Sequence, residues 1–431
     1  MAEPEEASEP DAGEEMAEPE ESAALKTGLG VDPDTMTIRV GVNTDLSGPF
    51  APLTTKITDG HQVYWEWLND RGGVQGWTVE PVILDNGYDV PRFREHYEVM
   101  SGEGDESVVM FSTSIGSPHN LAIRGELLED HLVAVPLSWY SGWADPEIGQ
   151  NVLEIQANYC IEAMNGVTYM AETYGDKWAL ITWPGDYGED AAIGAKLAAE
   201  NLGLELVYDG QGAVSPVPGT DHTPVITEIV NSGADWVWIA TSATQTAPIM
   251  GGAFQAGFTG HWGGSGPSWN PALLNTPVGP LADQLYTFSY YTVLWNASDS
   301  QGMRDVIAAM REYRPEAPFD DLYVLSWIYG LITSQILDQA ITDGDLTRAG
   351  VEAAAKKITA DLQGLAPDQT WSGEPNANIV RETYIYDIDL AAYTPGRTVM
   401  DEGNNGISLI KGPYASETAL NWEYEPCFKA S

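Results

Sequence analysis

The alternation of strand-like and helix-like segments is the feature that most constrains this chain, and it is clearest between residues 37 and 89. A β-branched run within 37–50 ends in a Ser-Gly-Pro turn, and the next segment, 57–73, carries apolar residues at helical spacing. That segment closes on Arg-Gly-Gly, a typical helix end. Residues 78–86 then return as a second strand. We interpret the stretch as a β-α-β unit whose first strand ends at a ligand-facing loop.

The same alternation continues through two thirds of the chain. Helices are predicted at 91–102 and 118–131, and strands at 108–113 and 132–138, so four strands alternate with three helices. Such an order predicts a parallel sheet covered on both faces. After an extended piece at 152–157 the pattern restarts with four pairs of helix and strand: 158–174 and 177–184, 188–202 and 204–210, 223–231 and 235–241, 245–256 and 261–266. The fold class is therefore α/β, with two doubly wound parallel-sheet lobes.

Beyond residue 285 the pattern changes to long helices between two extended runs. The runs are 285–294 and 382–390, and the predicted helices lie at 299–313, 321–342 and 347–363. We expect the first run to cross back so that these helices complete the first lobe, and the second run to return to the second lobe. Three crossings would form a three-strand hinge around a cleft at the carboxyl ends of the strands.

The predicted domain organisation has three parts. Residues 1–35 form a tether, 36–154 plus 289–376 form the N-terminal lobe, and 155–288 plus 377–431 form the C-terminal lobe. The tether is predicted to be disordered because it holds 12 acids and one lysine and almost no bulky apolar side chain.

Charge and cysteine content narrow the partners and the compartment. The formal net charge of −45 makes nucleic acid or an anionic bilayer an improbable partner. The folded part is acidic too, which fits either a saline environment or ordinary solubility. No run of 18 apolar residues occurs. An acidic, Pro-rich spacer ahead of a compact domain is typical of an exported protein held by a lipid anchor. The two cysteines, Cys160 and Cys427, fit either one disulfide in an exported protein or two buried thiols.

Four ordered motifs give the chain a recognisable resemblance. They are VGVNTDLSGPFA (40–51), WLNDRGGVQGWTVEPVILDN (67–86), GDYGEDAAIGAKLAAENLG (185–203) and IVNSGADWVWIA (229–240). In this order they resemble the type I periplasmic solute-binding proteins of ABC transporters, of the leucine/isoleucine/valine-binding branch, over residues 37–390. The resemblance implies a two-lobe clamp that delivers a solute to a permease and its ATPase.

The resemblance also assigns candidate ligand contacts. In that family a loop after the third strand holds the ligand carboxylate with hydroxyls and backbone N–H groups at a helix start, where anions are favoured. An alternative role for these hydroxyls is to cap the helix that begins near Pro118. The predicted contacts are Thr113, Ser114, Ser117, Ser138, Trp139 and Tyr140 in the first lobe, Tyr187 and Ser242 in the second, and Leu53 and Tyr323 on helices.

One departure from the family bears on the ligand. Amino-acid binders pair the ligand ammonium with a carboxylate, but the matching stretch, 263–270, has no acid and offers Ser268 and Trp269. A desolvated ammonium without a counter-charge costs several kcal/mol. Asp186 or Asp45 are the alternative counter-charges. Aromatic residues near several strand ends favour an amide, a heterocycle, an aromatic acid or a sugar-like face.

An enzyme is the competing class. The sequence contains no G-x-S-x-G, H-E-x-x-H or P-loop motif, and its six histidines show no metal-ligand spacing. We therefore expect no catalysis, cofactor or metal, although 64 acids leave a glycosidase-type pair open.

The function expected from the sequence is solute binding for an ABC transporter. The predicted solute is a small polar molecule: a branched-chain or other amino acid, an amide or a related carboxylate. The predicted protein is a monomer outside the cytoplasm, touching the membrane only through a possible lipid anchor. A ligand-sensing module for a signalling receptor is the alternative, and a hydrolase is the weaker one.

Overall fold

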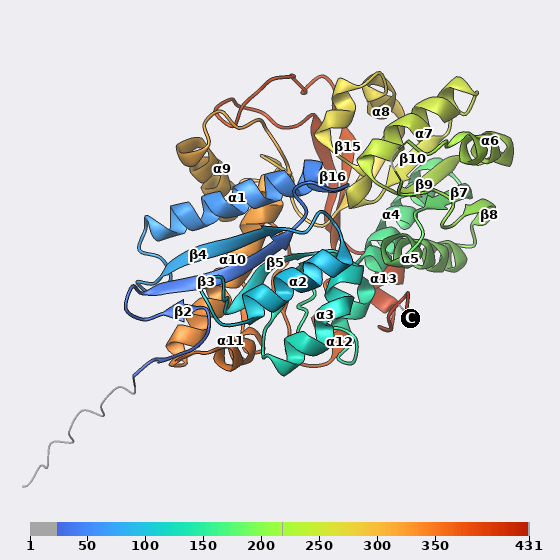
Figure 1. Cartoon of the computed structure of the whole chain (residues 1–431). Coiled ribbons are helices and arrows are strands. Elements are labelled where there is room, and N and C mark those ends of the chain that lie inside the picture. Colours follow the sequence, from blue (N-terminus) through green and yellow to red (C-terminus); the bar gives the residue numbers. More distant parts are fainter. Residues whose placement is uncertain (1–23, 218, 430–431) are drawn as a thin grey trace, which may run out of the picture.

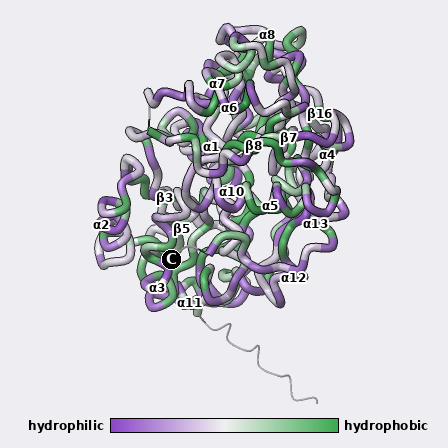
Figure 2. Tube along the Cα trace, turned by 90° about the vertical axis from the view of Figure 1, so that its right-hand side faces the viewer, coloured by the Kyte–Doolittle hydropathy of each residue, from purple (hydrophilic) through white to green (hydrophobic). Residues whose placement is uncertain are grey.

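The computed structural model of the protein describes residues 24–217 and 219–429. Two α/β lobes lie side by side, with the blue, cyan and orange segments in one and the green and yellow segments in the other (Figure 1). We call the lobe that contains β3 the first lobe and the lobe that contains β9 the second lobe. Hydrophobic residues concentrate on central strands such as β7, whereas hydrophilic ones are frequent on outer helices such as α2 (Figure 2).

The first lobe is built on a five-stranded sheet. Its strands are β2 (Val31–Asp32), β3 (Thr37–Thr44), β4 (Thr78–Asp85), β5 (Met110–Ile115) and β6 (Ala134–Leu137). The central strand β3 is parallel to β4 and β5, β5 is parallel to β6, and only β2 is antiparallel to its neighbour. The apolar side chains of β3 and β5 are almost fully buried, as expected for a sheet covered on both faces.

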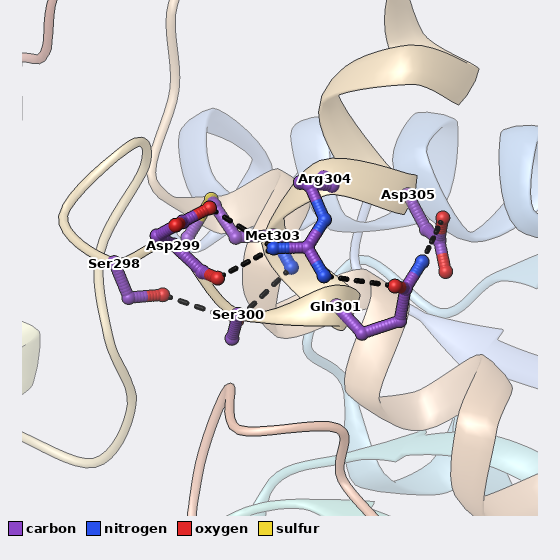
Figure 3. Close-up of polar contacts among 7 residues, drawn as sticks. All are labelled: Ser298, Asp299, Ser300, Gln301, Met303, Arg304 and Asp305. Atoms are coloured by element: carbon purple, nitrogen blue, oxygen red, sulfur yellow. Dashed lines mark hydrogen bonds and ion pairs between the residues drawn. The ribbon is translucent and has the colours of Figure 1, made fainter.

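Helices from both halves of the sequence cover this sheet. The early ones are α1 (Ala51–Asn69), α2 (Val90–Ser101) and α3 (Ser117–Glu129), and the late ones are α9 (Gln301–Tyr313), α10 (Leu322–Thr342) and α11 (Arg348–Ala355). Helix α10 packs against α1 and is buried along most of its length. The start of α9 is fixed locally: the Ser300 hydroxyl accepts from Met303 N at 3.2 Å, and Arg304 donates to Asp299 and Gln301 at 2.9 Å each (Figure 3).

The second lobe is built on a seven-stranded sheet. Its strands, in spatial order, are β16 (Ile407–Tyr414), β15 (Thr383–Ile388), β11 (Tyr286–Tyr290), β10 (His261–Gly264), β9 (Trp236–Ala240), β7 (Lys177–Thr182) and β8 (Glu205–Gly210). The covering helices are α4 (Tyr159–Tyr174), α5 (Asp186–Leu202), α6 (Thr223–Ser232), α7 (Ala243–Gln255) and α8 (Gly279–Leu285). β15 pairs antiparallel with β11 and with β16, so this sheet is mixed. The α/β class with two lobes is confirmed, with parallel pairing dominant.

The chain passes between the lobes three times: between β6 and α4, between β11 and α9, and between β14 (Gln369–Thr370) and β15. Whether these connections act as a hinge, and where the domain boundaries lie, stays a prediction.

Three parts of the secondary-structure prediction are corrected. The helix predicted over 347–363 ends at Ala355. The chain beyond it forms a hairpin of β13 (Thr359–Ala360) and β14, and Gln363 and Gly364 adopt positive φ in the turn between these strands. The predicted tether is too long: β1 (Lys26–Thr27) pairs with β12 (Asp345–Leu346), and β2 pairs with β3. Residues 1–23 lie outside the described residues. β16 has no counterpart in the prediction.

The C-terminal segment is fastened to both lobes. After α13 (Glu417–Asn421), Cys427 forms a disulfide with Cys160 of α4, so the proposed pairing is confirmed. Cys427 N donates to the Ser141 hydroxyl at 2.9 Å, and Phe428 N donates to Asp190 of α5 at 2.9 Å. Among the described residues, no helix is long and apolar enough to cross a membrane.

Candidate functional site

A cavity of about 270 Å³ lies between the lobes, at the carboxyl ends of the strands. The first-lobe residues that line it are Phe50, Leu53, Thr54, Ile57, Tyr88, Ile115, Gly116, Ser117, Pro118, Leu137, Ser138, Trp139, Leu322 and Leu325. The second-lobe residues are Tyr159, Trp183, Pro184, Asp186, Tyr187, Pro216, Ser242, Gly266, Pro267, Trp269, Tyr290 and Tyr291. Aromatic and aliphatic side chains dominate both walls.

The loop after β3 presents the first wall. Asp45 is fully buried, and its carboxylate accepts from the backbone N–H groups of Ser47, Gly48 and Phe50. These bonds shape the turn that leads into α1 and place Phe50 and Leu53 against the cavity. Because its oxygens are occupied by the turn, Asp45 serves as a structural acceptor and not as a ligand counter-charge.

Two serines follow β5 and β6 on the same wall. The Ser117 and Ser138 hydroxyls lie 2.6 Å apart, and the Trp143 indole N–H donates to Ser138 at 3.0 Å. Ser117 opens α3 directly after Gly116, whose φ of 84° is a left-handed conformation. A side chain at Gly116 would meet the His119 ring. The glycine therefore allows the loop to bring Ser117 to the cavity.

Tyrosine side chains form much of the second wall, and a buried residue outside the cavity lining fixes the orientation of one of them. The Tyr291 hydroxyl donates to Glu162 at 2.8 Å, and its ring stacks on Trp139 of the first lobe at a centroid distance of 4.4 Å. Glu162 also accepts from Gly266 N at 2.6 Å. Burial raises the pKa of Glu162 to about 8, against the opposing effect of these two hydrogen bonds. Glu162 thus orients two parts of the wall without lining it.

Asp186 is the one Asp or Glu among the described residues that line the cavity, and no Lys, Arg or His lines it. It stands in the first turn of α5. Burial raises its pKa, while hydrogen bonds from the Ser117 hydroxyl and from the backbone N–H groups of Asp186 and Tyr187 act in the opposite direction. The cavity is therefore apolar with one acidic group.

Contacts between the lobes close the cavity. The Phe50 and Trp183 rings lie 5.9 Å apart, edge to face. The Trp269 indole N–H donates to Asp321 at 3.2 Å, and the same carboxylate accepts from Trp295 N at 3.0 Å and from Asn405 at 2.9 Å. Asp321 precedes α10 of the first lobe, so it fixes Trp269 of the second lobe across the junction.

The family described as "Periplasmic binding protein" matches residues 37–394, which is most of the chain. The chain belongs to the periplasmic binding protein family. The resemblance seen in the sequence is confirmed at this level. No curated protein matches the sequence.

Solved structures of similar fold include several substrate-binding proteins. This periplasmic binding protein is similar to a fatty acid ABC transporter substrate-binding protein from Thermomonospora curvata, at 27% identity and a TM-score of 0.81, with 94% of this chain and 98% of that chain covered. A branched chain amino acid ABC transporter structure from Thermus thermophilus with bound valine matches at 18% identity and a TM-score of 0.74, with 91% and 98% covered. An R. palustris solute binding protein in complex with 4-hydroxybenzoate matches at 20% identity and a TM-score of 0.70, with 87% and 97% covered. The last two show the fold alone.

The predicted contacts divide into two groups in this binding protein. The cavity brings together Leu53, Ser117, Ser138, Trp139, Tyr187, Ser242 and Trp269. The structure places Thr113, Ser114, Tyr140, Ser268 and Tyr323 outside the cavity lining.

Hydrogen bonds or packing engage most of the second group elsewhere. Ser114 donates to Asn120 at 2.7 Å, and the Tyr140 hydroxyl donates to the Phe428 carbonyl at 2.6 Å. Ser268 bonds Ser265 O and the Tyr286 hydroxyl. Tyr323 is fully buried against Trp295 and Gly60, and Thr113 is buried in β5.

Several lining residues were not predicted. Phe50 and Tyr88 follow β3 and β4, Tyr290 and Tyr291 follow from β11, and Tyr159 opens α4. For Phe50, Tyr88 and Tyr291 the signal available in the sequence was an aromatic residue shortly after a strand end, whereas Tyr159 opens a helix and Tyr290 is the last residue of β11. Trp183 also lines the cavity.

Proposed function

We propose that this protein is the substrate-binding protein of an ABC transporter and that its solute is amphipathic, of the fatty-acid class. One observation carries the choice of solute: both walls of the interlobe cavity are aromatic and aliphatic, and no basic side chain lines it among the described residues. Burial of alkyl groups against such walls supplies the binding free energy. The similarity to the fatty acid transporter protein of Thermomonospora curvata supports the same class.

An α-amino acid fits this cavity poorly. Its ammonium and carboxylate would both need desolvated partners, whereas Asp186 is the one charged candidate and Asp45 is occupied by its own turn. This reverses the emphasis of the sequence-based expectation, which put amino acids first.

The proposed partners are a permease and its ATPase, and the proposed location is outside the cytoplasm. The protein acts as a monomer that hands over its solute unchanged. A reconstituted transporter should hydrolyse ATP faster with the solute-loaded protein than with the empty one, and an equal rate would contradict delivery.

Titration with a series of straight-chain acids tests the solute class. Hexanoic, octanoic and decanoic acid are titrated by calorimetry into protein freed of bound lipid. Each added CH2 group is expected to tighten binding about fourfold, since its burial contributes about 0.8 kcal/mol, until the cavity is filled. Leucine or valine binding more tightly than all three acids would overturn the proposal.

A matched pair of variants shows where the series binds. Trp139 lines the cavity and stacks on Tyr291, so Trp139→Ala should weaken octanoic acid binding by about 2 kcal/mol or more. Phe254 lies on α7 with 49% of its surface exposed and outside the cavity, so Phe254→Ala should leave affinity unchanged. Equal effects of the two variants would place the binding site elsewhere.

A further inference from the structure

Three of the polar side chains that line the cavity lie together: Ser117, Ser138 and Asp186. Ser117 and Ser138 lie at 2.6 Å from each other, and Ser117 also interacts with Asp186 across the cleft. The Trp143 N–H occupies Ser138 as an acceptor. If the Ser138 hydroxyl donates to Ser117 and the Ser117 hydroxyl donates to Asp186, each hydrogen bond in the series from Trp143 to Asp186 is donated toward the carboxylate. The solute therefore meets an acceptor beside these serines, the carboxylate of Asp186, which lines the cavity.

Within residues 24–217 and 219–429, no positive group balances Asp186. Its neighbours include further acids and several tyrosines, and burial keeps the imidazole of His119, which packs on the Tyr88 ring, neutral by lowering its pKa to about 4. The titratable groups around it are Tyr88 after β4, Tyr159 on α4, Tyr187 and Asp190 on α5, and Asp45 near Tyr88. The negative charge of Asp186 contributes to the raised pKa of Tyr88, Tyr159 and Asp190, after the larger effect of burial.

A solute carboxylate at this position would face a second carboxylate without a counter-ion. Two carboxyl groups in one desolvated site do not both ionise, because like charges repel strongly where water is excluded. A head group that donates a hydrogen bond and carries no negative charge meets no such cost. A primary amide or an undissociated acid has this property.

We propose that Asp186 is the specificity-determining residue of the cleft and that it selects an amphiphile with an uncharged, hydrogen-donating head group. This inference rests on the proposed function and adds to it the protonation state of the solute's head group. For a fatty acid, the O–H of the undissociated acid donates to an Asp186 oxygen, so the pair of carboxyl groups holds one proton. At a pH where Asp186 is ionised in the free protein, binding of the acid therefore takes up one proton from solution, and binding of the amide takes up none.

The pH dependence of two matched ligands tests this. Octanoic acid and octanamide are titrated into the protein between pH 6 and pH 8, which lies above the ordinary pKa of an alkyl carboxyl group, about 4 to 5. Where Asp186 is ionised in the free protein, the affinity for octanoic acid should fall about tenfold per pH unit, because the bound pair then needs a proton that the free acid and the free protein have both lost. The affinity for octanamide should stay constant. Calorimetry in two buffers of different ionisation enthalpy should report one proton taken up per octanoic acid bound.

Two variants of α5 locate the effect. In Asp186→Asn the amide of Asn donates to an ionised solute, so the pH slope for octanoic acid should vanish and its affinity at pH 8 should rise at least tenfold. Glu189→Gln removes a charge from the same helix turn outside the cavity lining and should retain the wild-type slope. Thermal unfolding of both apo variants verifies that they are folded.

The outcomes separate the two proposals. A pH-independent affinity of the wild type for octanoic acid, or an unchanged slope in Asp186→Asn, would overturn the role of Asp186 while leaving the solute class standing. Octylammonium binding more tightly than octanamide would overturn it as well, because Asp186 would then act as a counter-charge. Failure of all three ligands to bind would instead overturn the proposed function.

Discussion

Asp186 and Asp190 lie one turn apart on helix α5, and their surroundings differ completely. Asp186 lines the interlobe cavity and meets one side-chain hydroxyl, that of Ser117. Asp190 is fully buried and accepts from Ser141 N, from the Ser141 hydroxyl at 2.8 Å and from Phe428 N at 2.9 Å. The Asp186 carboxyl group faces space that a solute can fill, whereas the Asp190 carboxyl group is surrounded by protein groups.

This difference shows how a binding protein divides similar residues between two tasks. At Asp190, three donors from the first lobe and the C-terminal segment satisfy the carboxyl group, so its role is to join parts of the chain. Asp186 also accepts hydrogen bonds, from the Ser117 hydroxyl and from the backbone N–H groups of Asp186 and Tyr187, but its side chain lines the cavity and so can meet a ligand. The two residues are of one type and have similar numbers of internal donors, so access to the cavity is what separates their roles.

Replacing Asp190 is expected to have the largest effect on folding. Asp190→Ala leaves two backbone N–H groups and one hydroxyl buried without an acceptor, which should lower the free energy of unfolding by about 3 kcal/mol or more. Asp186→Ala should change it by less than about 1 kcal/mol, since Asp186 is only partly buried by protein groups. Chemical denaturation measures both, and equal losses would break the comparison.

Removing the disulfide tests the second link that holds the C-terminal segment, beside the hydrogen bond from Phe428 N to Asp190. The bond between Cys160 and Cys427 closes a loop across a sequence separation of 267 residues. Cys160→Ser with Cys427→Ser should lower the free energy of unfolding by about 3 kcal/mol, because the unfolded chain regains conformations. A protease should then cleave near residue 425 faster than in the wild type. Cleavage at the wild-type rate would mean that the hydrogen bonds of Phe428 and Cys427 suffice without the disulfide.

The sequence predicts the alternating elements well because burial periodicity and glycine-containing helix ends are local signals. Gly203 and Gly233 end α5 and α6 in the left-handed conformation, at boundaries where the prediction and the structure agree within one residue. The prediction of the third late helix, 347–363, fails for the converse reason. The apolar pattern runs on, but the helix ends at Ala355, and the residues beyond it pair as the hairpin of β13 and β14, which helical periodicity does not report.

The site was predictable to the level of loops and not of side chains. Ser114 and Ser117 lie in one predicted loop, yet only Ser117 lines the cavity, because Ser114 is bonded to Asn120 inside the lobe. Trp269 was predicted from its loop, but the bond that fixes it comes from Asp321, 52 residues away and in the other lobe. Such long-range pairings leave no periodic pattern in the sequence. Two cysteines leave only one possible intramolecular pairing, but the sequence left open whether they form a disulfide or remain two buried thiols.

A pH experiment on Glu154 gives the smallest expected effect and extends the comparison to a third acid. Glu154 is 4% exposed and accepts one described hydrogen bond, from Asn158 at 3.2 Å. Burial raises its pKa to about 8, opposed by the Asn158 bond and reinforced by the charge of Asp190. Because the folded state holds this proton more tightly than the unfolded state, its contribution to stability is fully present below the unfolded pKa, about 4.3, and is lost as the pH rises toward 8.

Glu154→Gln should therefore be more stable than the wild type at pH 8, by about 1 kcal/mol or more, and should equal it near pH 4, because glutamine keeps the hydrogen bond to Asn158 and never ionises. Thermal unfolding across this pH range measures the difference, with Glu189→Gln as a control that removes a charge from a side chain that is only partly buried. A constant difference at all pH values would mean that Glu154 stays ionised in the folded protein. If the prediction holds, ionisation of Glu154 lowers the stability of the folded protein. Loss of the proton shared by Asp186 and a bound acid lowers only the affinity for that solute.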